Sequence, residues 1–250
     1  MPLSFSTRGL AEGPDRLALG AERARELGFS AVHAARPPKD LAKGKAALAN
    51  LGLVLSSLEA TVPERVDLIS EVVDAAAGPA AALKRPLVVV DLQALVADPR
   101  ESAEAAVVRL SRTLHGLFAR WPGLSLALRA AHAPGRLLGF REMDWLLSDN
   151  PDKPVGLWMD PARALALERA QAGPGPLDWA DRFASRTLGI AVHGLGAGSG
   201  HVRPEEAGLD WGTLRGLLPL HAPRVLDVGP SLTSADVVDV RRRFEEMLGW

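Results

Sequence analysis

The sequence alternates short apolar stretches of strand character with longer stretches of helical periodicity. The pattern repeats at roughly the thirty-residue period of strand–helix–strand units, whose strands lie parallel in one sheet. The clearest strand is 87–91, because its run of valines suits a strand buried on both faces. The eight expected strands are 3–8, 30–33, 53–59, 87–91, 124–129, 155–160, 188–193 and 224–228.

Proline and glycine bound the helical stretches between these strands. We expect one helix from 62–64 to the Gly78-Pro79 pair, one from 99 to 121, and a closing helix that Ser234 caps. Segment 172–176 is rich in glycine and proline and is expected to be a loop. A chain of 250 residues suits one α/β domain, so we predict a single domain over 1–250.

The seventh expected strand shows which way the side chains face. Leu188, Ile190 and Val192 share its bulky face, whereas residues 189, 191 and 193 are Gly, Ala and His on the other. A bulky outer face under helices and a small inner face suit the wall of a barrel, with His193 at its mouth. The glycine-rich segment 194–200 is expected to form a mobile loop rather than to continue the strand.

Two observations favour a closed barrel over a doubly wound sheet. Segment 7–13, after the first strand, lacks the Gly-x-Gly-x-x-Gly turn of dinucleotide-binding folds, and the glycines of 194–200 have the wrong spacing. Charged side chains also stand at the carboxyl ends of the strands, where a barrel would gather them at one mouth. The sequence therefore predicts an α/β fold, a single (β/α)8 TIM barrel, with this ring at its mouth: Arg8, His33, Glu59, Asp91, Arg129, Asp160, His193 and Asp227.

Composition limits the partners that the protein is expected to have. Twenty-nine basic and thirty acidic residues give a net charge of −1, so no positive field attracts nucleic acid or anionic lipid. The absence of cysteine excludes disulfides, thiolate metal sites and thiol nucleophiles. Without an apolar run long enough to cross a bilayer, and without a recognisable signal peptide, we expect a soluble cytoplasmic protein.

The sequence resembles the xylose isomerase-like TIM barrels, a superfamily of sugar-phosphate isomerases, epimerases and endonuclease IV-like enzymes. The resemblance covers nearly the whole chain and rests on loose motifs at 28–32, 155–160, 191–193 and 208–211. In the isomerase and epimerase branch it implies one divalent metal, bound by Glu after strand five, Asp after strand six, His after strand seven and Glu after strand eight. Asp160 and His193 match this set, and Asp227 stands at the position of the last Glu.

Two positions depart from the set that the resemblance implies. Arg129 stands where the first Glu belongs, and Arg163 where the family often has a His. A divalent ion about 4 Å from a guanidinium would meet a repulsion on the order of 8 kcal/mol at an effective dielectric constant of 20. We therefore expect no cofactor, although four carboxylates against two arginines in the ring leave room for Mn, Mg, Co or Zn.

Three classes of function follow from these residues. The first is an isomerase or epimerase for a small polyhydroxylated or phosphorylated compound, in which His193 or Asp227 moves a proton and Arg129 stabilises an enolate oxygen. The second is a pseudoenzyme or binding protein for a small anionic ligand, and the third, an abasic-site nuclease, lacks the metal cluster and basic face that it needs. Besides the ring, the expected ligand-binding residues are His132, Trp158, Arg163 and His201.

Overall fold

Eight parallel strands close into a barrel in the computed structural model of the chain, as the alternating sequence pattern predicts. The model describes residues 3–10, 15–63, 65–81, 83, 85–96, 100–130, 138–195, 201–227, 229 and 232–249. The barrel strands are β1 (Leu3–Ser6), β2 (Ala31–Ala34), β3 (Val54–Thr61), β4 (Leu87–Asp91), β5 (Ser125–Arg129), β6 (Val155–Met159), β7 (Thr187–Val192) and β10 (Arg224–Leu226). Neighbouring strands follow the order β1-β10-β7-β6-β5-β4-β3-β2, so the first and last strands of the chain close the barrel.

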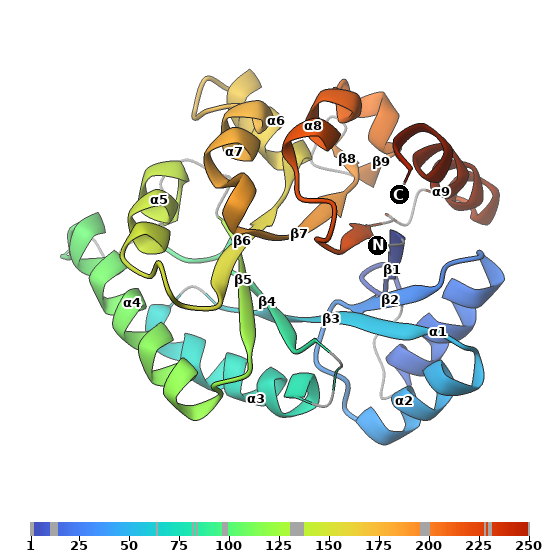
Figure 1. Cartoon of the computed structure of the whole chain (residues 1–250), viewed down its shortest axis with the longest axis horizontal. Coiled ribbons are helices and arrows are strands. Elements are labelled where there is room, and N and C mark those ends of the chain that lie inside the picture. The colour runs from blue at the N-terminus through green and yellow to red at the C-terminus, as the bar shows by residue number, and fades with distance from the viewer. Residues whose placement is uncertain are drawn as a thin grey trace.

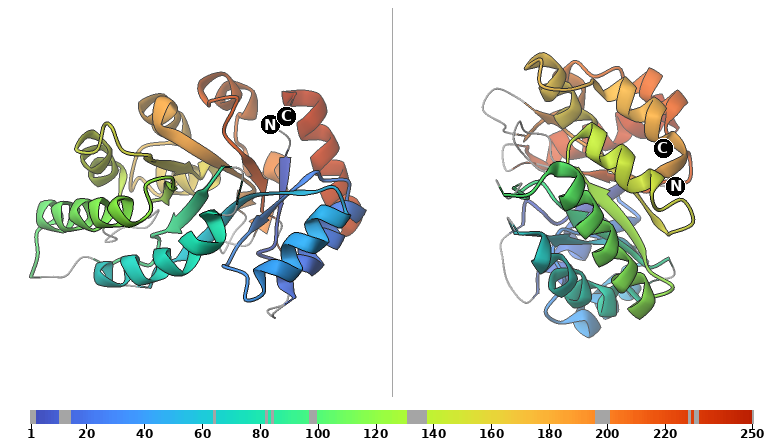
Figure 2. Two further views of the ribbon diagram at one scale, coloured as in Figure 1. Left: turned by 60° about the horizontal axis from the view of Figure 1, so that its bottom comes forward. Right: turned by 90° about the vertical axis from the view of Figure 1, so that its left-hand side faces the viewer.

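Helices surround the strands on the outside of the barrel (Figure 1), and two further views show the same ring from other sides (Figure 2). Within the described part of the chain, no helix is both long and apolar enough to cross a membrane. The helices are α1 (Arg16–Glu26), α2 (Leu41–Asn50), α3 (Ile69–Ala81), α4 (Ala103–Arg120), α5 (Phe140–Ser148), α6 (Pro161–Arg169), α7 (Pro176–Phe183), α8 (Trp211–Leu217) and α9 (Ser234–Leu248).

Three expected helix boundaries are wrong. Helix α3 follows a short 3-10 turn (Val66–Leu68) and continues through Pro79, whose missing N–H removes one backbone hydrogen bond close to the helix end. Helix α4 begins only after Ser102, whose hydroxyl accepts the Ala105 N–H at 3.1 Å. Thr233 rather than Ser234 caps α9, because its hydroxyl accepts the N–H of Asp236.

Helix α7 was not predicted from the sequence. It starts at Pro176, the last residue of the segment that was expected to be a loop. Pro176 occupies the first helical turn, where its missing N–H costs nothing, and the Asp178 carboxylate accepts the Gly175 N–H at 3.0 Å. The Pro-Gly-Pro composition marked the start of a helix as well as the end of a loop.

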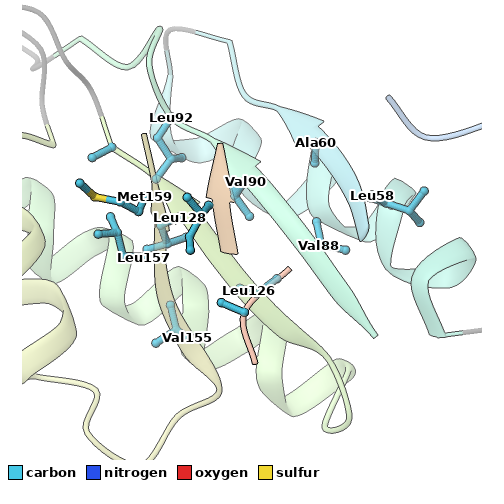
Figure 3. Close-up of a cluster of buried hydrophobic side chains, with 14 of the residues drawn as sticks. Leu58, Ala60, Val88, Val90, Leu92, Leu126, Leu128, Val155, Leu157 and Met159 are labelled. Atoms are coloured by element: carbon cyan, nitrogen blue, oxygen red, sulfur yellow. The ribbon is translucent and has the colours of Figure 1, made fainter. Parts of the chain in front are cut away.

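Two apolar layers lie on the two faces of the barrel wall. The outer faces of the strands pack under the helices, and Figure 3 shows this layer over β3 to β6. A smaller group inside the barrel, here called the inner cluster, consists of Leu87, Val89, Ala127, Trp158, Ala191 and Val225.

The prediction that the bulky side chains of the seventh strand all face outward is wrong at one residue. Ile190 and Val192 join the outer layer, but Leu188 packs against the inner cluster. The pairing between β6 and β7 shifts at this point, because Leu157 pairs with Thr187 and the next residue, Trp158, pairs with Gly189. Leu188 is therefore skipped in the register, and the irregularity directs its side chain inward.

The first glycines after His193 continue as backbone pairing, which corrects the expectation that segment 194–200 is entirely loop. Strand β8 (Gly194–Leu195) pairs antiparallel with β9 (His201–Val202). An added Cβ at Gly194 would lie 2.5 Å from the Arg203 carbonyl oxygen, so the close approach of the two chain segments requires glycine here. Residues 196–200 lie outside the described residues.

Candidate functional site

The eight charged residues of the expected ring lie together at the carboxyl end of the barrel. Asp91 and Arg129 are the last residues of β4 and β5 and stand opposite each other in the register. His33 and Glu59 come from β2 and β3, whereas the other four follow the ends of β1, β6, β7 and β10. All except Arg8 are buried, and the contacts below join them into one network, here called the mouth network.

Arg129 is at the centre of the mouth network and is only 3% exposed. Its Nη1 lies 3.3 Å from Glu59 Oε2 and 4.0 Å from Asp91 Oδ2. Its Nε lies 3.9 Å from Asp160 Oδ2, and its Nη2 lies 3.7 Å from Asp227 Oδ2. One guanidinium thus faces four carboxylates from four strand ends and offsets part of their buried negative charge.

Arg8 supplies a second cation beside the first. Its Nη2 donates to both carboxylate oxygens of Glu59, at 2.5 and 2.6 Å, and its Nε donates to Asp227 Oδ2 at 3.1 Å. Arg16, in the first turn of α1, fixes the backbone that carries it by donating to the carbonyl oxygens of Thr7 and Arg8. Sequence reasoning missed Arg16, because nothing in its local pattern distinguishes it from a surface arginine.

His193 and Asp160 form a buried pair on neighbouring strands. His193 Nε2 lies 2.9 Å from Asp160 Oδ1, and both side chains are 1% exposed. Asp160 also caps α6 by accepting the Arg163 N–H at 3.2 Å, and the Arg163 side chain lies 3.4 Å from Asp160 Oδ2. Asp160 thus fixes both the histidine ring and the start of the following helix.

His33 and Trp158 lie deeper, beneath the centre of the network. His33 contacts the Ser57 hydroxyl at 2.8 Å through Nδ1 and Glu59 Oε2 at 3.4 Å through Nε2. Its ring stacks on Trp158 with centroids 5.6 Å apart, and the Arg129 guanidinium lies 5.9 Å from the Trp158 ring centre. Ser57 was missed, although it stands two residues before Glu59 on the same strand face.

Burial and neighbouring charge set the pKa values of the four carboxyls differently. Burial alone would raise the pKa of Glu59 and Asp227, but Arg129 and Arg8 outweigh it and hold both values below the ordinary range. Burial is likewise outweighed at Asp160, whose pKa is held well below its usual value by His193 first and then by the nearby arginines. Asp91 is the exception, because burial and the charge of Glu59 raise its pKa despite Arg129.

A divalent metal does not fit this arrangement. Asp160, His193 and Asp227 are the residues that match the family's ligands, but Arg129 contacts both carboxylates within 4.0 Å. Among the described residues, no three His, Asp or Glu side chains are grouped so that they could bind an ion together. A cation among these carboxylates would have to displace the guanidinium that now neutralises them.

Two expected ligand-binding residues are not placed by the structure. His132 lies outside the described residues, and for His201 only the backbone position in β9 is described. Trp158 and Arg163 both lie against the mouth network, Trp158 below it and Arg163 beside Asp160 at its edge. The roles expected for these residues stay predictions.

No family model and no curated protein matches this sequence. Solved structures do match it over nearly its whole length. A D-tagatose 3-epimerase-like protein has a TM-score of 0.75 at 16% identity and covers 100% of this chain and 97% of its own. An AP endonuclease family 2 protein from Brucella melitensis has a TM-score of 0.70 at 14% identity, covering 98% and 99%.

A third similar structure is the 3-keto-D-glucoside 4-epimerase YcjR from E. coli, with a TM-score of 0.67 at 12% identity over 98% of this chain and 99% of that one. At these identities the matches establish fold and not chemistry, and they include both epimerases and an endonuclease. The barrel and its structural neighbours confirm the fold that the resemblance implies: the chain folds as a (β/α)8 TIM barrel.

Proposed function

We propose that the protein is a metal-independent isomerase or epimerase of a small, neutral, polyhydroxylated compound such as a ketose, with a role in carbohydrate metabolism. The observation that carries the proposal is the position of Arg129 within 4.0 Å of four buried carboxylates. The guanidinium holds N–H donors in place at this mouth, and these can hydrogen-bond to a developing enolate oxygen. A metal ion is then not required for that role.

Charge balance supports a neutral substrate over an anionic one. Arg8 and Arg129 are each already paired with carboxylates, so neither guanidinium offers an uncompensated charge to a phosphate. Hydroxyl groups can both donate to the carboxylates and accept from the guanidinium groups, which suits a network of this mixed kind. A sugar phosphate, or an anionic ligand of a non-catalytic binding protein, therefore has less support than a neutral sugar.

The residues divide into roles for proton transfer next to a carbonyl. Asp160 holds the His193 ring at Nε2, so Nδ1 is the atom that would take the proton from carbon. Asp227 is a poor base because its pKa is held low by Arg8 and Arg129 despite its burial. Asp91, at the end of β4, is the second group, which would return a proton to the carbon, so that the epimerisation involves no net oxidation.

The test follows solvent deuterium into D-fructose and D-tagatose by NMR, with EDTA present throughout. We expect exchange of hydrogen beside the carbonyl, and a rate about 10²–10⁴ lower in His193→Asn. Arg25→Ser, an exposed substitution on α1, is the control for purification and folding. Binding of a ketose without exchange would instead identify a non-catalytic sugar-binding protein, and exchange that requires added Mn²⁺ would contradict metal independence.

A second test concerns the metal directly and uses Arg129→Glu. The substitution removes the guanidinium and places a third carboxylate beside Asp160, Asp227 and His193. Without metal the variant should melt below the parent, because like charges in a buried site repel. Mn²⁺ or Co²⁺ should raise the melting temperature of the variant and leave that of the parent unchanged. For a micromolar site saturated a thousandfold, the gain in unfolding free energy is about 4 kcal/mol. A parent that is stabilised equally would refute the proposal.

A further inference from the structure

The amino end of the barrel, where the strands begin, has small side chains on the interior face. Ser4, Ala31 and Ser125 occupy such positions in β1, β2 and β5. TIM barrels usually fill this interior with layers of bulky branched side chains. Small residues at the first interior layer leave space below the inner cluster.

That space is a cavity of about 640 Å³, here called the amino-end cavity. Its volume lies within the range of roughly 300–1,000 Å³ that is usual for small-molecule sites. Leu87 belongs to the inner cluster and Leu188 packs against it. These two side chains therefore form the floor of the amino-end cavity. The lining residues are Ser4, Ala31, Val54, Leu55, Ser56, Arg85, Pro86, Leu87, Ser125, Leu188, His221, Ala222 and Pro223.

The inner cluster separates the amino-end cavity from the mouth network. Trp158 is fully buried in this cluster, and its ring contacts His33 and Arg129 on the mouth side. No residue of the ring of eight lines the cavity. The amino-end cavity therefore lies on the opposite side of the inner cluster from the mouth network.

The cavity lining combines an apolar floor with a cationic edge. Its described lining residues include no Asp or Glu, and the two ionisable residues among them, Arg85 and His221, are both exposed. Arg85 forms no ion pair with any other described residue, unlike the two arginines of the mouth network. A guanidinium beside an apolar pocket is suited to a carboxylate, which it binds through parallel N–H donors.

We propose that the amino-end cavity is a second ligand site, which binds a small monocarboxylate with an apolar chain or ring. The apolar part lies against Leu87 and Leu188, where its removal from water drives binding. The carboxylate accepts hydrogen bonds from Arg85 at the edge of the cavity. Binding here is independent of the chemistry proposed for the mouth.

The experiment titrates octanoate into the full ¹⁵N-labelled protein and follows the backbone amide shifts. 1-Octanol, with the same chain and no charge, and acetate, with the charge and no chain, are the matched probes. Arg85→Ser removes the proposed carboxylate partner, and Arg25→Ser removes an equal charge from α1 as its control. Ser125→Phe places a large ring in the cavity.

We expect octanoate to shift amides around the cavity, such as Ala31 and Ser125, and to bind about fivefold more weakly in Arg85→Ser but not in Arg25→Ser. Octanol should bind more weakly than octanoate, acetate should not bind detectably, and Ser125→Phe should lose octanoate. Shifts confined to the mouth, equal affinity for octanol, or equal losses in the two arginine variants would each overturn the proposal. Because Arg85 is exposed, its variant stays informative even if Ser125→Phe does not fold.

Discussion

At the carboxyl end of the barrel the strands end in charged side chains that neutralise one another, whereas at the amino end they begin with small and apolar side chains that leave a cavity. The same strands supply both ends, and only the inner cluster separates them. Arginine shows the difference most plainly, because Arg129 is buried among four carboxylates and Arg85 is exposed and pairs with no carboxylate of the described residues. The end of the barrel at which an arginine lies therefore decides whether carboxylates surround it.

The largest effect should come from removing the cation at each end in turn. Arg129→Leu leaves four buried carboxylates without their common partner and should lower the free energy of unfolding by about 3–5 kcal/mol. Arg85→Leu should change it by no more than about 0.5 kcal/mol, as is usual for surface positions. Urea unfolding at pH 7 measures both. Similar losses in the two variants would mean that the mouth network contributes no more than the exposed end.

Two carboxyls within the mouth network should respond to pH with opposite signs. The folded-state pKa of Asp227 lies below its unfolded value, so its contribution is present above about pH 4 and is lost as the pH falls. Asp227→Asn should therefore lose about 3 kcal/mol at pH 7, with a difference from the parent that shrinks in acid. The pKa of Asp91 is raised in the folded state, so its contribution to the free energy of unfolding decreases as the pH rises through that folded-state pKa.

Asp91→Asn should accordingly be more stable than the parent at neutral pH, and the gain should vanish below about pH 4. Unfolding free energies of the parent and both variants from pH 3 to 8 measure the two trends. The gain should be smaller than the loss in Asp227→Asn, because Asp91 lies 4.0 Å from Arg129 and has no closer ion pair among the described residues. If the unfolding free energies of the two variants changed with pH in parallel, Asp227 and Asp91 would not differ as their opposite pKa shifts predict.

The smallest effect concerns the layer between the two ends. An added Cβ at Gly189 would lie 2.1 Å from Cζ3 of Trp158, so Gly189→Ala should cost about 1–3 kcal/mol through overpacking. Trp158→Leu in the same chain should remove most of that penalty, which a double-mutant cycle measures. Gly116→Ala on α4, where the nearest side-chain atom is 3.6 Å away, should instead stabilise by up to about 1 kcal/mol.

The closed barrel and the ring of charges were predictable because strand and helix patterns alternate along the chain and each expected strand carries a charged residue at or near its carboxyl end. His193 and Arg129 could be placed in this way. Leu188 could not, because the shift between β6 and β7 depends on how two strands pair. Helix α7 was missed although Pro176 and Asp178 mark its start locally. The role of Arg16 depends on tertiary contacts that composition does not encode, and the cavity appears only when several small residues from separate strands are brought together.

The bond between Arg8 and Asp227 joins two residues that are 219 positions apart, one after the first strand and one after the last. Contacts of such separation form late in folding, because a long loop must close before they contribute any free energy. In a chain whose first and last strands have not yet paired, Asp227 lacks this arginine, whereas Glu59 can reach it through the pairing of β1, β2 and β3. Closure of the β1–β10 seam thus gains backbone hydrogen bonds and the Arg8–Asp227 ion pair in one event, which makes the final folding step cooperative and leaves the open eight-strand sheet with little stability of its own.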